Sequence, residues 1–176
     1  MKKYIGLVLV AMSGCILTVN AQQSFSYKNP LLPTELRVND LLGRMTLEEK
    51  IAQIRHLHSW DVFDGQILNQ EKLDKMCGGI GYGFFEGFPL TAASCRKTFR
   101  EIQTYMVEKP RLGIPGFPVA ESLHGVVHEG TTIYPQNIAM GSTFNPELAY
   151  EKTKHIAGEL NTMGVKQVLA PCIDVV

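Results

Sequence analysis

The stretch that decides the fold runs from Arg111 to Leu148 and reads RLGIPGFPVAESLHGVVHEGTTIYPQNIAMGSTFNPEL. Within it, a short apolar segment, 116–120, ends in the carboxylate of Glu121. A polar loop with two histidines follows, and then a helix that Asn145 can cap. The α/β folds place their ligand sites at the carboxyl ends of strands that lead into helices. The pattern therefore predicts a strand that presents an acidic side chain at a candidate ligand site.

Outside this stretch, the apolar residues predict further helices and strands in alternation. Helical spacing predicts a helix over 34–54, broken near Arg44 because a capping box, Thr46 to Glu49, starts a second helix at Leu47. Further helices are expected over 91–108 and 145–163. Buried strands are expected over 77–84, 116–120 and 165–176. The last strand is rich in apolar residues, as in a parallel sheet that is covered on both faces.

This order predicts repeated βα connections, as in a parallel barrel or a doubly wound sheet. A dinucleotide-binding fingerprint is missing, because Phe84 stands where Gly79-x-Gly81 would need its third glycine. We therefore expect an α/β chain that forms the N-terminal portion of a (β/α)8 TIM barrel. A whole barrel takes about 250 residues, whereas this chain has 176. Residues 22–176 are thus expected to be an incomplete barrel domain of a longer protein.

The first 21 residues have the composition of an export signal. Lys2 and Lys3 precede an apolar stretch, Tyr4 to Val19, and small residues up to Ala21 suit a signal peptidase. We expect cleavage after Ala21 and a periplasmic or extracellular mature chain with no membrane span. Two alternatives remain. One is a transmembrane anchor, although the stretch is shorter than the roughly 20 apolar residues that a span needs. The other is a lipoprotein signal acylated at Cys15.

Composition and charge are those of an ordinary globular protein, with 45% hydrophobic residues and a formal net charge of zero. No basic excess indicates nucleic acid, so no nucleic-acid partner is expected. Beyond the signal, the cysteines are Cys77, Cys95 and Cys172, with no Cys-x-x-Cys motif. Two of them could pair in an exported protein. Buried thiols that pack as small hydrophobic side chains are the preferred interpretation.

Five short motifs, in this order and at this spacing, resemble glycoside hydrolase family 3, the exo-acting β-glycosidases. They are LGRMTLEEK (42–50), RLGIP (111–115), ESLHG (121–125), YPQ (134–136) and LAPCID (169–174). The resemblance extends from about Leu36 onward. It implies a (β/α)8 barrel followed by a C-terminal α/β sandwich. It also implies an enzyme of carbohydrate catabolism, which hydrolyses terminal non-reducing β-D-glucosyl or β-D-xylosyl residues with retention.

Retaining hydrolysis needs two carboxyl groups about 5 Å apart, a nucleophile and an acid/base. By the resemblance, both groups come from later segments that this sequence does not include. The chain alone is therefore expected to be inactive and to need the remainder of its barrel. The resemblance implies no cofactor and no metal.

The substrate-binding candidates that the resemblance implies are Glu121, His124 and Asp174. Glu121 matches a position whose carboxylate accepts hydrogen bonds from the terminal sugar, and many glucose-cleaving members have aspartate there. The extra methylene of glutamate takes up space near the C6 group, which xylose lacks. It therefore favours β-xylosides, within the roughly 1–3 kcal/mol that one methylene can discriminate. The alternative for Glu121 is a solvated loop acid. Asp174 is either a support for a family arginine or a strand-end turn acid.

Two groups of histidines stand out beside these candidates. His124 and His128 have the spacing of a His-x-x-x-His zinc motif, but Gly125 replaces its glutamate and the segment is a poor helix former. We expect no metal there. Instead, His124 should orient the loop by hydrogen bonding, and His128 should lie near the pocket rim.

The second group, 56–61, follows the N-terminal helices and contains His56, His58, Trp60 and Asp61. Trp60 could stack on a sugar, although burial or a contact that fastens the loop is commoner for a lone tryptophan. Two other functions remain open. One is a non-catalytic carbohydrate-binding barrel. The other is a β-N-acetylhexosaminidase of the same family, a branch that the 121–125 motif resembles less.

Overall fold

A computed structural model describes residues 25–87 and 91–172. The chain divides into two compact units, Met1–Gly43 and Arg44–Val176. The predicted signal segment, including Cys15, and the candidate Asp174 lie outside the described residues.

The first unit contains a 3-10 turn, η1 (Ser26–Lys28), and most of helix α1 (Thr34–Arg44). The Tyr27 amide donates to Asp40 Oδ2 over 3.0 Å, and Arg37 Nε donates to the Tyr27 carbonyl over 2.9 Å. These two bonds fasten η1 to α1. The helix predicted to start at Thr34 and to end near Arg44 is confirmed.

The second unit alternates strands and helices. Its strands are β1 (His56–His58), β2 (Phe63–Asp64), β3 (Ile67–Leu68), β4 (Phe84–Glu86), β5 (Phe117–Glu121) and β6 (Gln167–Leu169). Its helices are α2 (Leu47–Gln53), α3 (Ser59–Val62), α4 (Gln70–Cys77), α5 (Ala92–Glu108), α6 (Asn137–Gly141) and α7 (Pro146–Met163). Strands β2 and β3 form a small antiparallel hairpin that is separate from the main sheet.

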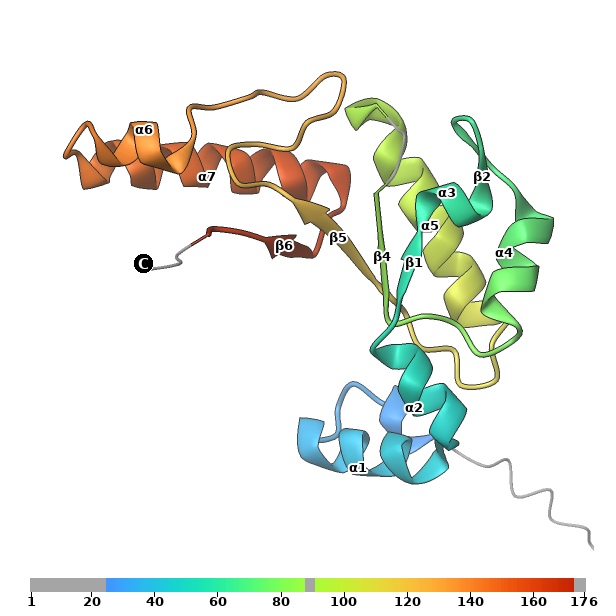
Figure 1. Cartoon of the computed structure of the whole chain (residues 1–176). Coiled ribbons are helices and arrows are strands. Elements are labelled where there is room, and N and C mark those ends of the chain that lie inside the picture. Colours follow the sequence, from blue (N-terminus) through green and yellow to red (C-terminus); the bar gives the residue numbers. More distant parts are fainter. Residues whose placement is uncertain (1–24, 88–90, 173–176) are drawn as a thin grey trace, which may run out of the picture. The chain divides into compact units, whose positions relative to one another are not determined.

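The main sheet has four strands within the described residues, all parallel, in the order β1-β4-β5-β6 (Figure 1). Each later strand is added beside the one before it, always on the same edge. A doubly wound sheet reverses its order at a switch point, whereas a (β/α)8 barrel does not. The predicted α/β class, with parallel strands in barrel order, is confirmed.

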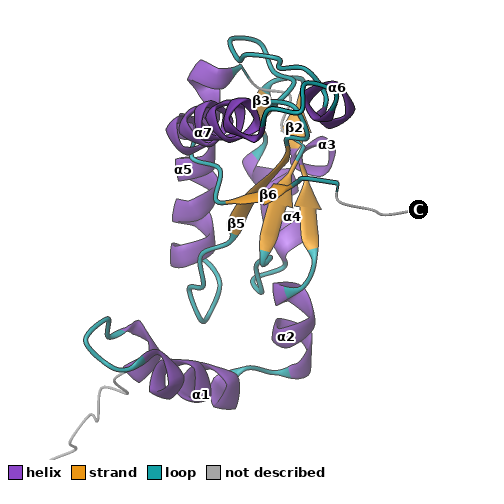
Figure 2. Ribbon diagram, turned by 90° about the vertical axis from the view of Figure 1, so that its left-hand side faces the viewer, coloured by secondary structure: helices purple, strands orange, loops and turns teal. Residues whose placement is uncertain are grey.

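The core of the second unit lies between the sheet and helices α5 and α7, which are on one side of the strands (Figure 2). Leu57 of β1 and Phe85 of β4 are both almost fully buried. The ring of Phe85 meets that of Phe99 on α5 edge to face, with centroids 5.7 Å apart. Removing these side chains from water is the main source of stability here.

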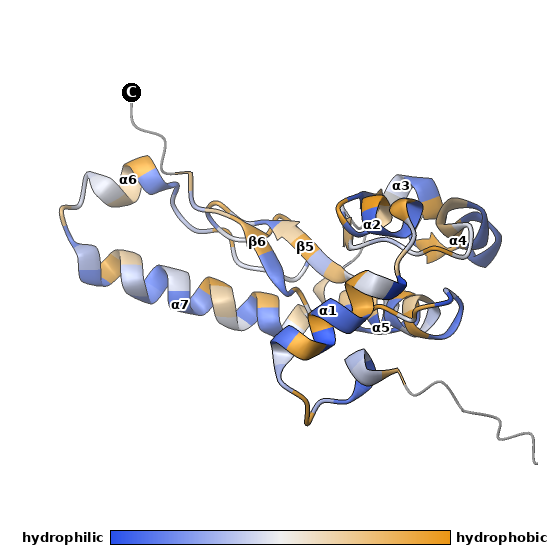
Figure 3. Cartoon of the chain, turned by 90° about the horizontal axis from the view of Figure 1, so that it is seen from below, coloured by the Kyte–Doolittle hydropathy of each residue, from blue (hydrophilic) through white to orange (hydrophobic). Residues whose placement is uncertain are grey.

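Helix α7 is amphipathic, with hydrophobic and hydrophilic residues in alternation along its length (Figure 3). Its buried residues, Lys152, Ile156, Leu160 and Met163, recur every three or four positions and so form one face. Asn145 caps the helix by accepting from the Leu148 amide, and Gly164 ends it in the left-handed conformation. The predicted helix is confirmed at both ends.

The strand predicted over 77–84 is wrong. Helix α4 occupies the chain up to Cys77, and Gly78, Gly79 and Gly81 then adopt positive φ values of 53°, 77° and 84°. An extended strand requires negative φ, so the glycines form a turn and β4 begins only at Phe84. The sequence interpretation also missed β1, α4 and α6.

The strand predicted over 165–176 is shorter than expected and is not covered on both faces. Strand β6 spans Gln167–Leu169, and Val168 and Leu169 are 37% and 41% exposed because β6 is the edge of the described sheet. Cys77 and Cys95 are buried free thiols, in agreement with the preferred interpretation of the sequence, whereas Cys172 is exposed.

Candidate functional site

Strands β1, β4 and β5 end in polar residues at the same edge of the sheet. His58 ends β1 and is paired in register with Glu86, which ends β4, while Glu121 ends β5. Side chains alternate along a strand, so His58 and Glu86 point away from the buried Leu57 and Phe85. The helix-side face is therefore apolar, and the other face carries the polar groups at its carboxyl edge.

Glu121 lies where the sequence predicted an acid, as the last residue of β5. Its side chain is exposed, and it lines a hollow at the strand ends. Among the described residues, no group forms a hydrogen bond or ion pair with its carboxylate. The Glu121 carboxylate is thus available to a ligand.

Glu86 carries a second carboxylate at this edge, between two histidines of β1. Its Oε2 lies 3.2 Å from His56 Nδ1, and its Oε1 lies 3.2 Å from His58 Nδ1. Each contact becomes an ion pair when the imidazole is protonated. The Glu86 side chain is 22% exposed, so the two imidazoles hold it without covering it.

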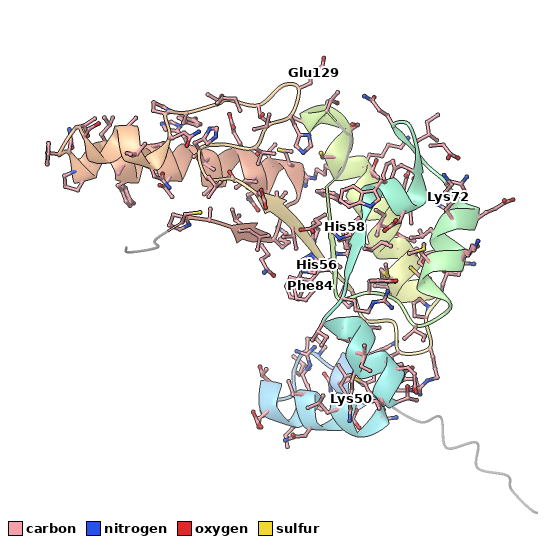
Figure 4. The ribbon with its side chains drawn as sticks, in the orientation of Figure 1. Lys50, His56, His58, Lys72, Phe84 and Glu129 are labelled. Atoms are coloured by element: carbon pink, nitrogen blue, oxygen red, sulfur yellow. The ribbon has the colours of Figure 1, made fainter. Side chains whose placement is uncertain are left out.

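Aromatic rings extend from this carboxylate across the strands. The Trp60 ring stacks on His58 at 4.4 Å with an interplanar angle of 7°, and His56 stacks on Phe84 at 5.0 Å. Figure 4 shows His56, His58 and Phe84 close together on β1 and β4. Trp60 remains 66% exposed, so it is not buried, whereas its stacking on His58 agrees with the other expectation, a contact that fastens this segment.

These groups surround a hollow of about 380 Å³ at the carboxyl ends of β4 and β5. The described residues that line it are Trp60, Glu86, Gly87, Cys95, Phe99, Val119, Ala120, Glu121, Val126, Val127, His128, Met163 and Val165. Its polar groups come from strand ends and from the loop after β5, and its apolar groups come from the core. Burial raises the pKa of the Cys95 thiol to about 11, so this thiol is uncharged at neutral pH.

The loop after β5 is held by backbone bonds and by α7. The Tyr134 amide donates to the His124 carbonyl over 2.7 Å, and Thr132 Oγ1 donates to Glu159 Oε1 over 2.7 Å. Gly125 has a φ of 106°, and a Cβ there would lie 2.3 Å from the Thr132 carbonyl oxygen. Only glycine fits this crossing of the loop over itself.

The two loop histidines have different positions. His124 contributes its backbone carbonyl to the loop, whereas its ring Nδ1 is buried and has no hydrogen-bond partner among the described residues. His128 lines the hollow, close to where the rim was predicted. The structure therefore brings His128, and not the ring of His124, to the hollow with Glu121.

Across the described residues, no three His, Cys, Asp or Glu side chains are grouped so that they could hold a metal ion. Within 25–87 and 91–172, no helix combines the length and the apolar composition that crossing a bilayer requires.

The sequence interpretation missed Glu86 as a site residue. The alternation of His56-Leu57-His58 and of Phe84-Phe85-Glu86 was a signal for two half-polar strands. Their pairing follows only from the fold, since β4 begins 26 positions after β1 ends.

Known proteins resemble this chain in sequence and in structure. The family model described as the glycosyl hydrolase family 3 N terminal domain matches residues 46–176. A candidate β-xylosidase from Formosa agariphila is 31% identical over 159 residues, which cover 88% of this chain and 21% of the relative. A periplasmic β-glucosidase from Salmonella typhimurium is 27% identical over 175 residues, which cover 98% of this chain and 21% of the relative.

A solved structure of a β-glucosidase from Erythrobacter marinus superimposes with a TM-score of 0.72 and 27% identity, and the match covers 88% of this chain and 20% of that one. This chain therefore spans about a fifth of the length of the relatives that it matches. The family match includes β5, its terminal Glu121 and the loop that follows. The chain belongs to glycosyl hydrolase family 3 and carries the N-terminal domain of that family over residues 46–176.

Proposed function

We propose that this protein is a retaining exo-β-glycosidase that removes terminal β-D-xylosyl or β-D-glucosyl residues, and that the described residues help to bind the sugar. The observation that carries this proposal is the Glu121 carboxylate. It has no partner among the described residues, ends a barrel-type strand and faces a hollow, in a chain of family 3. Relatives named as a candidate β-xylosidase and a β-glucosidase support the substrate class.

The chemistry of the proposed reaction divides between two parts of the protein. Retaining hydrolysis uses a nucleophile that forms a glycosyl-enzyme and an acid/base that protonates the leaving oxygen. We assign both carboxyl groups to sequence beyond Val176. We assign to residues 22–176 the first part of the barrel domain, whose proposed contribution is to bind and orient the terminal sugar.

Glu121 is the proposed specificity residue. A carboxylate accepts hydrogen bonds from vicinal hydroxyl groups with two oxygens. At a fixed strand end, the extra methylene of glutamate moves these oxygens further into the site than aspartate would. The glutamate oxygens then occupy the space that the C6 hydroxymethyl group of a hexose would need. A pentose lacks this group and therefore fits better. His124 supports this residue through the loop backbone, and Asp174 is proposed as a further supporting residue.

The test uses the complete gene product, obtained by reading the coding frame past Val176. Glu121→Asp should raise the turnover of nitrophenyl β-glucoside relative to nitrophenyl β-xyloside by about 10-fold to 200-fold, the range of one methylene. Glu129→Gln, an exposed acid of the following loop, is the matched control (Figure 4). An unchanged ratio in Glu121→Asp would remove the specificity proposal, and an absence of β-glycosidase activity would remove the function itself.

We propose export as well, with the segment 1–21 as a cleaved signal. A periplasmic relative that matches 98% of this chain supports this location. The mass of the mature N-terminus distinguishes the two routes. Cleavage by signal peptidase leaves Gln22 as the first residue, whereas the lipoprotein route leaves an acylated Cys15.

A further inference from the structure

The carboxyl edge of the sheet carries two groups that the proposed function does not use, Glu86 and Trp60. Both line the same hollow as Glu121. We propose that Glu86 and Trp60 bind the same sugar residue as Glu121, with Glu86 accepting hydrogen bonds from its hydroxyl groups and Trp60 packing against its ring. This inference rests on the proposed glycosidase function and extends its binding site to β1 and β4.

The spacing of the two carboxylates suits one sugar ring. The register of β4 and β5 pairs Phe85 with Pro118, and its continuation by one residue places Glu86 level with Val119, two residues before Glu121. Adjacent strands lie about 4.8 Å apart and rise about 3.3 Å per residue, so the two backbone positions are roughly 8 Å apart. Side chains that lean toward the hollow from these positions can reach hydroxyl groups on two sides of a pyranose.

Glu86 is prepared to accept hydrogen bonds from a ligand. A carboxylate has about four acceptor sites, and at most one on each oxygen faces an imidazole, since Oε2 lies 3.2 Å from His56 Nδ1 and Oε1 lies 3.2 Å from His58 Nδ1. The other sites face outward, since the side chain is partly exposed. His56 and His58 are positioning residues, because they fix the rotation of the carboxylate without reaching over it. A fixed acceptor loses less entropy on binding than a mobile one.

Trp60 offers a flat apolar surface at the mouth of the hollow. One face of the Trp60 ring stacks on His58. Among the described residues, the ring makes no other aromatic contact. The axial C–H groups of a β-linked pyranose form an apolar face that packs on such a ring, by the same dispersion and quadrupole effects that hold aromatic pairs. Trp60 is 66% exposed and lines the hollow together with two carboxylates, so a ligand held by these carboxylates can reach its ring.

The charge of the hollow indicates a neutral ligand. Its wall contains two carboxylates and no lysine or arginine among the described residues. A uronic acid or a phosphorylated sugar would bring a like charge to both carboxylates, which costs binding free energy. A neutral pentose or hexose brings only hydroxyl donors and an apolar face.

The experiment compares sugar binding and turnover in the complete gene product. Affinities for free xylose and glucose come from calorimetry, and kcat and KM come from nitrophenyl β-xyloside and β-glucoside. Glu86→Gln keeps the size and removes the charge, and it should weaken sugar affinity about 10-fold to 100-fold, as expected for hydrogen bonds to a charged group. Trp60→Ala should weaken it about threefold to tenfold, and Trp60→Phe by less.

Two further variants separate binding from folding. His58→Gln should raise KM and leave kcat within about twofold, because it loosens the Glu86 carboxylate but touches no reacting atom. Glu71→Gln, an exposed acid in the first turn of α4, should leave both constants unchanged. Thermal unfolding of each variant, close to that of the parent, shows that the fold is retained.

The outcomes distinguish this inference from the proposed function. If the protein hydrolyses β-glycosides, but Glu86→Gln and Trp60→Ala bind both sugars as the parent does, the inference is wrong and the function stands. If the protein hydrolyses no β-glycoside, the function is wrong, and the calorimetric affinities still decide the inference, since binding needs no turnover. If neither sugar binds to the parent, the inference is wrong, and turnover of the nitrophenyl glycosides alone decides the function.

Discussion

The guanidinium of Arg111 forms a bidentate ion pair with the carboxylate of Glu49, which lies 62 positions earlier in the chain. Its Nε donates to Oε1 over 3.1 Å and its Nη2 donates to Oε2 over 2.7 Å. The same Nη2 donates to the Arg44 carbonyl over 2.8 Å. Two of the family motifs, 42–50 and 111–115, are therefore joined by one bidentate ion pair. It fixes the start of α2 against the segment that leads into β5.

This pair should make a measurable contribution to stability, because Glu49 is only 8% exposed. Arg111→Lys retains the charge but loses the planar fork that bonds both oxygens. We expect it to lower the free energy of unfolding by about 1–2 kcal/mol, and Glu49→Gln by about 2 kcal/mol, in urea titrations. Glu101→Gln is the control, since its ion pair with Lys97 is exposed and 3.9 Å long, and should cost less than about 0.5 kcal/mol. Equal costs for Glu49→Gln and Glu101→Gln would contradict this assignment.

The same pair predicts a dependence of stability on pH. Hydrogen bonding from Arg111, against a smaller opposing effect of burial, lowers the pKa of Glu49 below its ordinary value of 4.5. A carboxyl group with a lowered folded-state pKa stabilises the fold fully above its unfolded value. It loses that contribution as the pH falls through the folded value. The stability difference between the parent and Glu49→Gln should therefore be constant near neutral pH and shrink below about pH 4.5. A difference that stays constant into acid would refute this linkage.

Local signals account for the parts of the fold that could be predicted. The capping box at Thr46 and the Asn145 and Gly164 caps act within a few residues of the helix ends that they define, and all were correct. The strand prediction for 77–84 was wrong, because an apolar run rich in glycine has the same composition whether it forms a strand or a left-handed turn.

Only the site residue whose position depends on a single strand could be predicted from the sequence. Glu121 follows an apolar strand directly, so its place at the sheet edge could be inferred from the sequence. Glu86 and Trp60 join it through the pairing of β1 with β4 and of β4 with β5. Such pairing depends on long-range contacts that no local pattern encodes. Three-residue strands also carry too few residues for a clear period.

Two glycines should respond to alanine in opposite directions. A Cβ at Gly83, just before β4, would lie 1.8 Å from the carbonyl oxygen of Gln53 at the end of α2. Gly83→Ala should therefore cost about 3 kcal/mol or more, because backbone must separate from backbone. Gly158, inside α7, has nothing within 4 Å of its Cβ position, and Gly158→Ala should stabilise the protein by about 0.5–1 kcal/mol. Denaturant titrations of the two variants test both signs, and two effects of the same sign would show that the close approach at Gly83 is misplaced.

Lys152 should control the loop that carries His124 and His128. Although it is only 8% exposed, its Nζ donates to the Pro135 carbonyl over 3.1 Å and to Asn137 Oδ1 over 2.8 Å. Lys152→Met fills the same space but leaves both acceptors without their donor. It should lower stability by about 1–3 kcal/mol. Because this donor ties the end of the loop to α7, amide exchange of the segment 124–137 should also accelerate in the variant, more than that of α5. Lys154→Met, two residues further along α7, removes an exposed lysine 3.5 Å from Glu151 and should change neither quantity. If the two variants exchange alike over 124–137, Lys152 is a buried side chain of α7 that does not hold the loop.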